Sequence, residues 1–235
     1  MGRILFVVTN VGRIGPRDRP TGYEFSEVAH PFLVFAAEGI AVDFASPLGG
    51  SPPEDGFDPS DSASVLFRES AAFRRLNRSL RLADVVLERY DAVFFPGGLG
   101  PMVDLYRDPG VKAAVAHMHE LGRVVGAVCH GPVALLDVRL PDGSNFLQGR
   151  RVAAFTSAEE EGHSLEDVPF LLDAALVRQG ARHSGGSPFE AHVVVDGNLV
   201  TGQNPASARG VARAMVELSR SGKASTVEAR GQGGS

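Results

Sequence analysis

Short apolar runs alternate with longer stretches of helical pattern along most of the chain. Apolar runs of strand length occur at Ile4–Val8, Val42–Ala45, Ala92–Phe95, Val124–Val128, Val152–Phe155 and Ala191–Val195. Helical patterns occur at Glu24–Glu38, Lys112–Leu121, Pro132–Leu136, Val168–Arg178 and Ala206–Ser219. Apolar strands that alternate with helices predict an α/β protein with a doubly wound, mainly parallel sheet and helices on both faces. Functional sites in such folds lie beyond the carboxyl ends of the strands.

Residues 49–89 interrupt this alternation. They open with the loop signal Gly49–Asp55, which is rich in glycine and proline, and continue with a helical pattern at Ala63–Asn77. The length of the segment exceeds that of a simple connection. We therefore expect an insertion or subdomain within one domain that spans residues 1–218, rather than a second domain.

The C-terminal part of the chain carries two further signals. Asp196-Gly197 stands between two apolar runs, which predicts a hairpin over Val193–Val200. Residues 219–235 are rich in glycine, serine and charge, a composition that rarely supports a packed core. We expect a disordered tail over these residues.

Composition and charge narrow the range of partners. Of the 235 residues, 43% are hydrophobic and 22% are charged, and the formal net charge is -5. No basic cluster gives the electrostatic footprint of a nucleic-acid-binding protein, and no segment approaches the ~20 apolar residues of a membrane span. One cysteine excludes an intramolecular disulfide and fits a cytoplasmic location. We expect neither a nucleic acid nor a membrane as partner.

The candidate chemistry centres on Cys129, which ends the apolar run Val124–Val128 and precedes His130-Gly131-Pro132. This context predicts a thiol at a sharp turn from a buried strand into a helix, the geometry of a nucleophile elbow with cysteine in place of serine. The unpaired amides of a helix N-terminus favour an anion, so we expect a thiol pKa below the ordinary value of about 8.5. The alternative is a small buried hydrophobic residue without chemistry.

Two titratable residues are candidates for proton transfer. His130 could exchange protons with the thiol, although consecutive side chains usually point apart and a surface role is the alternative. Glu27 falls in the first predicted helix, where a solvated helix face is the simpler interpretation. A Glu27 carboxyl buried against the thiol would instead stay protonated, and it could donate a hydrogen bond or a proton.

Further candidates follow other predicted strands. The acidic run Glu159–Glu161 comes after Val152–Phe155, where one carboxylate could orient His130, with a solvated loop as the alternative. The turn Gly97-Gly98-Leu99-Gly100 follows Ala92–Phe95, and its glycines allow backbone amides to approach a developing oxyanion, with a plain turn as the alternative. No metal-ligand spacing and no dinucleotide motif occur, so we expect neither a metal nor a cofactor.

Together these residues resemble the ThiJ/PfpI superfamily, also called class I glutamine-amidotransferase-like, and within it the glyoxalase III and heat-shock chaperone branch. The elbow match is Ala127–Pro132. The other matching segments are Thr21-Gly22 with Glu27 and Pro31-Phe32, Val42–Pro47, Phe95–Gly100 with Asp104, and Leu199–Ala208. The similarity extends over nearly the whole chain, and the elbow and the Thr201–Ser207 run are its specific parts.

The resemblance implies a flavodoxin-like fold and an enzyme that needs no cofactor. It assigns the nucleophile to Cys129 and the adjacent histidine to His130. It further assigns the acidic partner of that histidine to Glu160 and the proton-handling glutamate to Glu27.

The resemblance also locates the oxyanion amides, at Gly98 and His130. The family pattern reads Gly-Gly-His-Gly at the turn around Gly98, whereas this chain has Leu99 between Gly98 and Gly100. The apolar Leu99 replaces a polar pocket residue, which favours a more apolar substrate.

The activity implied is that of a glyoxalase III-like lyase, which converts methylglyoxal or a related 2-oxoaldehyde into the hydroxy acid without glutathione. Two other kinds of function stay open. One is a hydrolase or hydratase that acts on another small electrophile, such as an amide or an isocyanide. The other is a non-catalytic stress protein, either a holdase chaperone with an exposed apolar patch or a redox sensor that oxidises at Cys129. A homodimer is compatible with the sequence.

Overall fold

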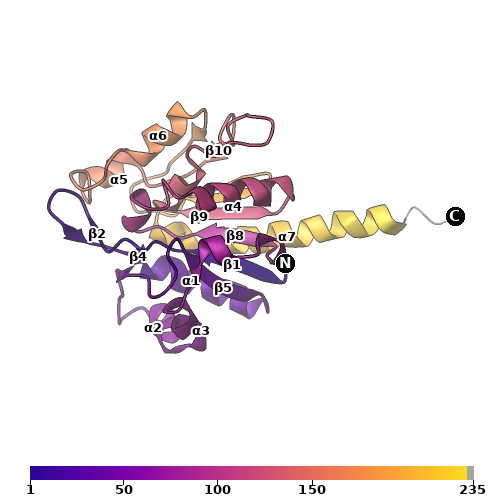
Figure 1. Cartoon of the computed structure of the whole chain (residues 1–235), viewed down its shortest axis with the longest axis horizontal. Helices are drawn as coiled ribbons and strands as arrows, with labels where there is room; N and C mark the ends of the chain where they lie inside the picture. Colours follow the sequence, from indigo (N-terminus) through magenta and orange to yellow (C-terminus); the bar gives the residue numbers. More distant parts are fainter. Residues whose placement is uncertain (232–235) are drawn as a thin grey trace.

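The computed structural model describes the backbone of residues 1–231 and the side chains of residues 1–220 (Figure 1). A seven-stranded sheet in the order β12-β13-β9-β8-β1-β5-β7 forms its centre. The strands are β1 (Arg3–Val7), β5 (Ala41–Ser46), β7 (Leu80–Arg81), β8 (Ala92–Phe95), β9 (Val124–Val128), β12 (Val193–Asp196) and β13 (Leu199–Gly202). All neighbouring pairs are parallel except β12 with β13. The doubly wound, mainly parallel α/β fold is therefore confirmed.

Helices cover both faces of the sheet. On one face α1 (Phe25–Ala37) packs against α7 (Ala208–Gly231), and on the other α4 (Pro109–Glu120) packs against β8 and β9. Successive side chains of a strand point to opposite faces. In β1, Phe6 accordingly enters the core beneath α1 and α7, whereas Leu5 enters the core beneath α4. The apolar runs of the sequence are continuous because these strands are buried on both sides.

Small elements gather at the carboxyl ends of the parallel strands, on the left of Figure 1. The hairpin of β2 (Arg13–Ile14) and β3 (Arg19–Pro20) follows β1, and β4 (Tyr23–Glu24) pairs in parallel with β6 (Glu54–Asp55). These short pieces build walls above the edge of the sheet where the sequence places the candidate site.

The segment of residues 49–89 is integrated into this architecture. It contains β6, α2 (Ser62–Glu69), α3 (Ala71–Leu76), β7 and the 3₁₀-helices η1 (Leu82–Asp84) and η2 (Leu87–Arg89). Its strand β7 forms one edge of the central sheet, beside β5. The single helix expected over Ala63–Asn77 is two helices, because Ser70 has an extended backbone and its hydroxyl caps α3 by accepting from the Phe73 N–H at 3.1 Å.

The strand predicted at Val152–Phe155 is wrong in extent and in position. Arg151–Val152 alone is a strand, β10, and it pairs with β11 (Arg182–His183) outside the central sheet. Both edges of β9 are already taken by β8 and β13, so no position beside it is free. The chain instead crosses the carboxyl edge, where the Phe155 N–H donates to the Cys129 carbonyl oxygen at 2.9 Å.

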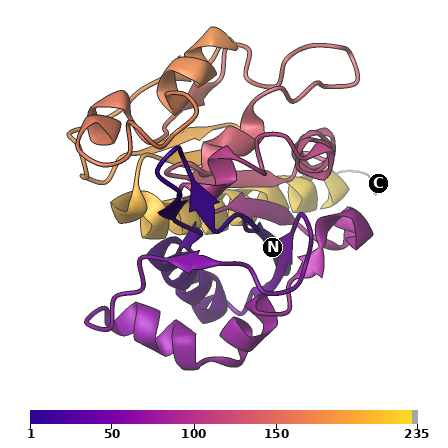
Figure 2. The same ribbon diagram turned by 60° about the vertical axis from the view of Figure 1, so that its left-hand side comes forward.

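Two short helices follow this crossing. The first, α5 (Ser157–Glu161), was not expected from the sequence, and the second, α6 (Leu172–Arg178), begins four residues into the predicted helix Val168–Arg178. Figures 1 and 2 show α5 and α6 grouped at one end of the molecule, opposite α2 and α3. The segment from β10 to α6 therefore forms a second wall beside the carboxyl edge of the sheet.

The C-terminal part contains one confirmed and two corrected expectations. The hairpin around Asp196-Gly197 is confirmed, with Val195 opposite Val200 and Gly197 at a φ of +57°. The strand expected over Ala191–Val195 begins at Val193. After the 3₁₀-helix η5 (Pro205–Ser207), α7 runs to Gly231 instead of ending near Ser219.

The sequence beyond Ser219 accounts for the longer helix. Good helix formers such as Lys223, Ala224 and Glu228 continue the last turns, and extending an existing helix needs no new nucleus. Residues 232–235 of the expected disordered tail lie outside the described residues. The domain boundary at residue 218 stays a prediction.

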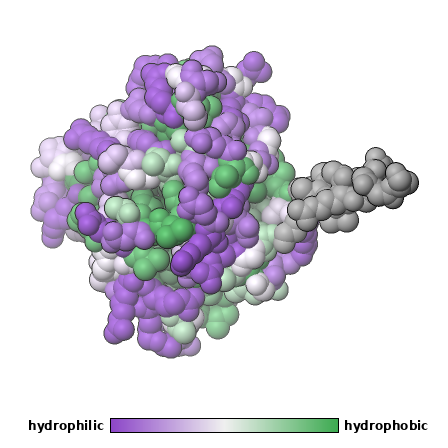
Figure 3. All heavy atoms as spheres, turned by 45° about the vertical axis from the view of Figure 1, so that its right-hand side comes forward, coloured by the Kyte–Doolittle hydropathy of each residue, from purple (hydrophilic) through white to green (hydrophobic). Residues whose placement is uncertain are grey.

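The surface mixes polar and hydrophobic side chains. Large hydrophobic side chains that are exposed come from segments far apart in sequence, among them Leu48, Leu66, Leu121 and Val177. On the face shown in Figure 3, a hydrophobic group near the middle is surrounded by polar residues. Within residues 1–231, no helix is long and apolar enough to cross a membrane.

Candidate active site

Cys129 lies where the chain turns from β9 into the 3₁₀-helix η4 (Gly131–Leu135). Its N–H donates to the Gly202 carbonyl oxygen at 2.9 Å, and its φ of +61° falls in the left-handed region that non-glycine residues rarely occupy. Gly131 permits the close turn, because a Cβ there would lie 2.1 Å from the Phe95 carbonyl oxygen on β8. A strained residue between a strand and a helical turn matches the local geometry expected of an elbow.

The helix that follows the cysteine differs from the expected one. Instead of an α-helix over Pro132–Leu136, η4 is a 3₁₀-helix of 5 residues. Burial and the charge of Glu27 raise the pKa of the Cys129 thiol well above its ordinary value, whereas the Gly98 N–H favours the thiolate. The expectation of a lowered thiol pKa is therefore wrong in direction, because desolvation of the buried sulfur outweighs what one short helical turn can offer.

The Glu27 carboxyl is buried beside this thiol. Its Oε2 accepts the Gly97 N–H at 2.6 Å, and its Oε1 has no nitrogen or oxygen partner. Burial, followed by the charge of Glu24, raises the pKa of Glu27 well above its ordinary value. Two buried acids in contact cannot both ionise easily, so the pair of Glu27 and Cys129 retains a proton at neutral pH. The solvated helix face considered for Glu27 is thereby excluded.

His130 lies on the other side of the sulfur. Its Nδ1 is 3.3 Å from the Cys129 Sγ, and its Nε2 is 2.7 Å from Oε1 of Glu160, a glutamate of α5. The second Glu160 oxygen accepts from the buried Ser164 hydroxyl. The contact with Glu160 engages Nε2, so Nδ1 is the ring nitrogen that faces the thiol. The three side chains form a buried cysteine–histidine–glutamate line.

The three acids of the run Glu159–Glu161 have different surroundings. Glu160 faces His130, as described above. Glu159 closes a capping box at the start of α5, where its Oε2 accepts the N–H and the hydroxyl of Thr156 at 2.9 Å each. Glu161 is exposed. The resemblance and the geometry therefore point to the same glutamate.

The glycine-rich turn after β8 passes directly over the thiol. A Cβ on Gly97 would lie 2.8 Å from the Cys129 Cβ and 2.9 Å from Oε2 of Glu27. Gly98 has a φ of +91°, and a Cβ there would lie 2.3 Å from the Gly22 carbonyl oxygen. Glycine is required at both positions because larger residues would push the turn away from the sulfur. This close approach is what allows the Gly98 amide to face the thiol.

The remaining two residues of that turn, Leu99 and Gly100, lie in different surroundings. Leu99 is buried and lines the cavity next to Cys129. Gly100 begins the 3₁₀-helix η3 (Gly100–Met102) and packs against the turn after β1, since a Cβ on it would lie 2.7 Å from the Val11 carbonyl oxygen. The structure thus brings Gly98 and Leu99 to the site, whereas Gly100 supports the turn from outside.

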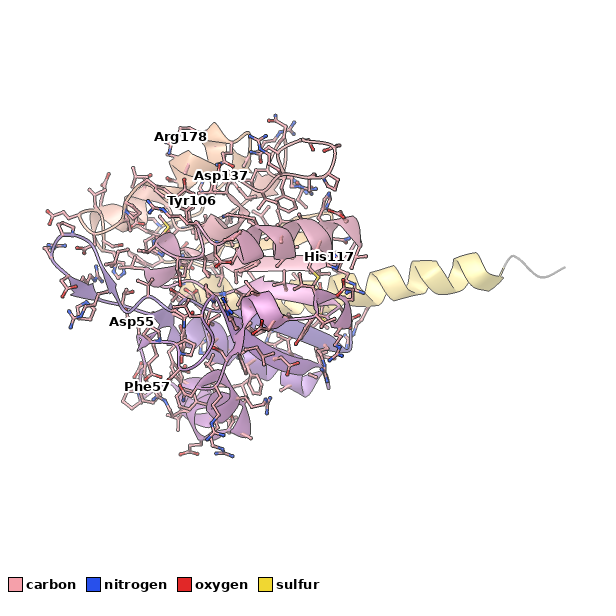
Figure 4. The ribbon with its side chains drawn as sticks, viewed as in Figure 1. Asp55, Phe57, Tyr106, His117, Asp137 and Arg178 are labelled. Atoms are coloured by element: carbon pink, nitrogen blue, oxygen red, sulfur yellow. The ribbon has the colours of Figure 1, made fainter. Side chains whose placement is uncertain are left out.

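A cavity of about 240 Å³ opens onto the thiol. Besides Cys129, His130, Gly98 and Leu99 it is lined by Arg19, Glu24, Asp55, Gly56, Phe155, His163, Phe189 and Pro205. Asp55 is labelled in Figure 4, at the carboxyl edge of the sheet. Most of these residues carry no motif in the sequence, because they come from six separate segments that meet only in the fold.

Larger hollows exist elsewhere on the protein. One of about 630 Å³ lies beside α3 and is lined by three arginines, among them Arg74, and another of about 530 Å³ lies beside Tyr106 and Phe170. Neither contains a residue of the cysteine–histidine–glutamate line. Among the described residues, no group of three or more histidine, cysteine, aspartate or glutamate side chains could hold a metal ion. The smaller cavity at Cys129 is the candidate active site because the perturbed titratable groups converge there.

Fold and site together define an α/β protein with a buried cysteine–histidine–glutamate line at the carboxyl edge of a parallel sheet. Residues 20–218 match the model of the DJ-1/PfpI family. The match covers most of the chain, and this protein therefore belongs to the DJ-1/PfpI family.

Individual relatives share nearly the full length of the chain. Glutathione-independent glyoxalase hsp3102 of Schizosaccharomyces pombe is 28% identical, over 91% of this chain and 95% of that protein. Among solved structures, Rapid Encystment Protein 24 KDa of Francisella tularensis has a TM-score of 0.89 and 32% identity, over 93% of this chain and 99% of that one. Glyoxalase III of Candida albicans has a TM-score of 0.83 and 22% identity, over 92% and 97% of the two chains, and shares the fold.

Proposed function

We propose that this protein is a glutathione-independent glyoxalase, a lyase that converts a 2-oxoaldehyde such as methylglyoxal into the 2-hydroxy acid. The observation that carries the proposal is the Cys129 thiol held between two proton carriers, with His130 Nδ1 at 3.3 Å on one side and the buried Glu27 carboxyl on the other. The Schizosaccharomyces pombe relative is a glutathione-independent glyoxalase, which supports the same activity.

The reaction begins with addition of the thiol to the aldehyde. The Cys129 sulfur bonds to the aldehyde carbon C1 as its proton moves to His130 Nδ1, so no free thiolate has to exist beforehand. The raised thiol pKa is compatible with this coupled transfer. We assign to the backbone amides of Gly98 and His130 the stabilisation of the negative charge on the aldehyde oxygen, which then takes up the proton from His130 to give a hemithioacetal.

The second step moves hydrogen from C1 to C2. Protonated Glu27 gives its proton to a substrate oxygen and becomes a carboxylate, which then removes the hydrogen from C1. Glu27 then delivers this proton to C2 of the resulting enediol and takes up the proton of the C1 hydroxyl, which returns Glu27 to its protonated form and leaves a thioester of the 2-hydroxy acid on Cys129. C1 is oxidised and C2 is reduced within one molecule, so the step needs no external oxidant or reductant.

Water completes the cycle by cleaving the thioester. The C–S bond breaks, the hydroxyl of water joins C1, and the water proton returns to the sulfur through His130. The net change is the addition of one water molecule to the 2-oxoaldehyde. Glu160 keeps the His130 ring in the orientation that both proton transfers require.

A substrate screen of wild type beside Cys129→Ser tests this function. Methylglyoxal, phenylglyoxal, simple amides and an isocyanide are offered, and the hydroxy acid, carboxylic acid and formamide products are measured. We expect the wild type to turn over the 2-oxoaldehydes and Cys129→Ser to lose that activity. Glu161→Gln, which changes an exposed carboxylate next to Glu160, serves as the matched control and keeps full activity.

The same screen separates the alternatives. Turnover of an amide or isocyanide in place of 2-oxoaldehydes would make the protein a hydrolase or hydratase. Oxoaldehyde turnover that survives in Cys129→Ser would remove the nucleophile from the mechanism. The cytoplasmic location and the homodimer stay predictions.

A further inference from the structure

The cavity at Cys129 is lined by two chemically different sets of side chains. The polar set is Arg19, Glu24, Asp55 and His163. The apolar set, which we call the apolar wall, is Leu99, Phe155, Phe189 and Pro205. The carbonyl groups of a 2-oxoaldehyde need hydrogen-bond donors, so the apolar wall is left for the substituent that the dicarbonyl carries.

Phe189 is the unusual member of the apolar wall. Its φ is +63°, in the left-handed region where a bulky side chain is strained, and 56% of its surface is exposed. An exposed ring gains little from burial, so hydrophobic burial compensates little of this backbone strain. Strain of this kind persists where the surroundings enforce it, and it concentrates at ligand sites.

The surroundings of Phe189 do enforce its position. Its N–H donates to Oε1 of Glu159 at 2.8 Å. The Asn204 amide donates to the same Glu159 oxygen at 2.8 Å and to the Glu190 carbonyl oxygen at 2.7 Å. Asn204 belongs to the Thr201–Ser207 run, whose specific sequence the proposed chemistry does not use. The Thr201–Ser207 run and Glu159 together fix the loop that carries the Phe189 ring.

An aromatic path connects Phe189 to the reacting centre. Its ring meets Phe155 edge-to-face, with centroids 6.2 Å apart and planes at 66°. The Phe155 ring in turn lies over the His130 imidazole, with centroids 4.5 Å apart. A flat substituent in contact with Phe155 and Phe189 would therefore extend away from His130 toward the cavity mouth.

We propose that Phe189 is the specificity-determining residue of this site and that it binds aryl substituents of 2-oxoaldehydes. The proposal rests on the glyoxalase activity proposed above and names its substrate class. Benzene fits a dry cavity of about 150 Å³ in another protein. The cavity here, of about 240 Å³, has room for a ring together with the dicarbonyl group. A methyl group would leave the apolar wall largely uncovered.

Steady-state kinetics with phenylglyoxal and methylglyoxal test this inference. We expect the wild type to have the higher kcat/KM for phenylglyoxal. Phe189→Ala should lower that value, relative to the value for methylglyoxal, by roughly tenfold to two-hundredfold, the range for losing an apolar contact in a specificity pocket. Phe189→Tyr keeps the ring and should restore the preference. Leu66→Ala removes a similarly exposed side chain from α2, away from the cavity, and should change neither substrate.

A second variant separates the ring from the backbone strain. Phe189→Gly accepts a φ of +63° without strain, so its melting temperature should equal or exceed that of wild type while the preference for phenylglyoxal is lost. If Phe189→Gly instead unfolds at lower temperature, the ring stabilises the fold and the ligand explanation of its strain is overturned.

Binding of the products mandelate and lactate, measured by calorimetry, provides a readout independent of turnover. Tighter binding of mandelate that is lost in Phe189→Ala supports the aryl-binding wall even if no oxoaldehyde is converted, in which case only the proposed activity fails. If wild type and Phe189→Ala convert the two substrates with the same ratio of kcat/KM, the activity stands and the role of Phe189 is refuted.

Discussion

The buried Glu27 carboxyl makes Glu27→Gln an informative perturbation. Glutamine has nearly the same shape as a protonated glutamate, and its side-chain oxygen can still accept the Gly97 N–H that now lies 2.6 Å from Oε2. Its amide can face the Cys129 sulfur as the acid hydroxyl does. The variant should therefore keep the fold while it removes one titrating group and one transferable proton.

The expected change in unfolding free energy with pH follows from the raised pKa of Glu27. Burial raises the pKa of Glu27, so the folded protein holds a proton that the unfolded chain releases above about pH 4.3. This contribution to stability is complete below about pH 4.3 and is lost as pH rises toward the raised pKa. The loss amounts to about 1.4 kcal/mol for each pH unit. Glu27→Gln has no such loss, so its unfolding free energy relative to wild type should rise with pH above about 5, with a slope of at most about 1.4 kcal/mol per pH unit.

Urea unfolding at about pH 5, 6 and 7 measures this gain. The control is Glu161→Gln, which removes an exposed carboxylate and should run parallel to wild type at all three values. In the same samples, turnover of Glu27→Gln should fall by roughly 10²–10⁴-fold, the usual contribution of a positioned proton carrier. If Glu27→Gln also runs parallel to wild type with pH, Glu27 is ionised in the folded protein and cannot be the proton donor of the proposed mechanism.

Two further predictions concern the thiol and the turn above it. Burial and the Glu27 charge raise the pKa of Cys129, so the labelling rate of wild type with iodoacetamide should have its pH midpoint above about 8.5. This pH midpoint should fall in Glu27→Gln. A wild-type midpoint below about 8.5 would contradict the assignment of the buried pair. Leu99 lines the cavity and offers no hydrogen bond to a hydrated aldehyde, and an unpaired polar group costs about 1–3 kcal/mol. Leu99→His should therefore raise kcat/KM for methylglyoxal by roughly tenfold to a hundredfold and lower kcat/KM for phenylglyoxal. An unchanged ratio would show that Leu99 does not shape the pocket.

The elements that the sequence predicted correctly are those whose signal is local. Ile4–Val8, Ala92–Phe95 and Val124–Val128 are apolar at every position because each strand contributes to two cores, so their pattern already reveals burial on both faces. The elbow could be located for a similar reason. A cysteine between an apolar run and His-Gly-Pro has few ways to leave a buried strand, and Gly131 is needed where the Phe95 carbonyl approaches.

Two of the failed predictions depend on what lies beside a segment. Val152–Phe155 has the composition of a strand, but β8 and β13 already occupy both edges of β9. The turn after Cys129 has the composition of a helix start, but burial and a neighbouring carboxyl, neither visible in the local sequence, set the direction of the thiol pKa. Local propensity cannot report competition for a partner or the loss of water around a charge.

The candidate active site also combines features predicted from the sequence with features that exist only in the fold. The sequence by itself predicted the parallel sheet, a sharp turn at Cys129 and, through resemblance, Cys129, His130, Glu27 and Glu160 as candidate site residues. The tertiary structure places Glu160 against His130, and it alone decided that Arg19, His163 and Phe189 line the cavity. The physical reason is that hydrophobic periodicity is written into each segment, whereas a cavity wall exists only once distant segments share the carboxyl edge of one sheet.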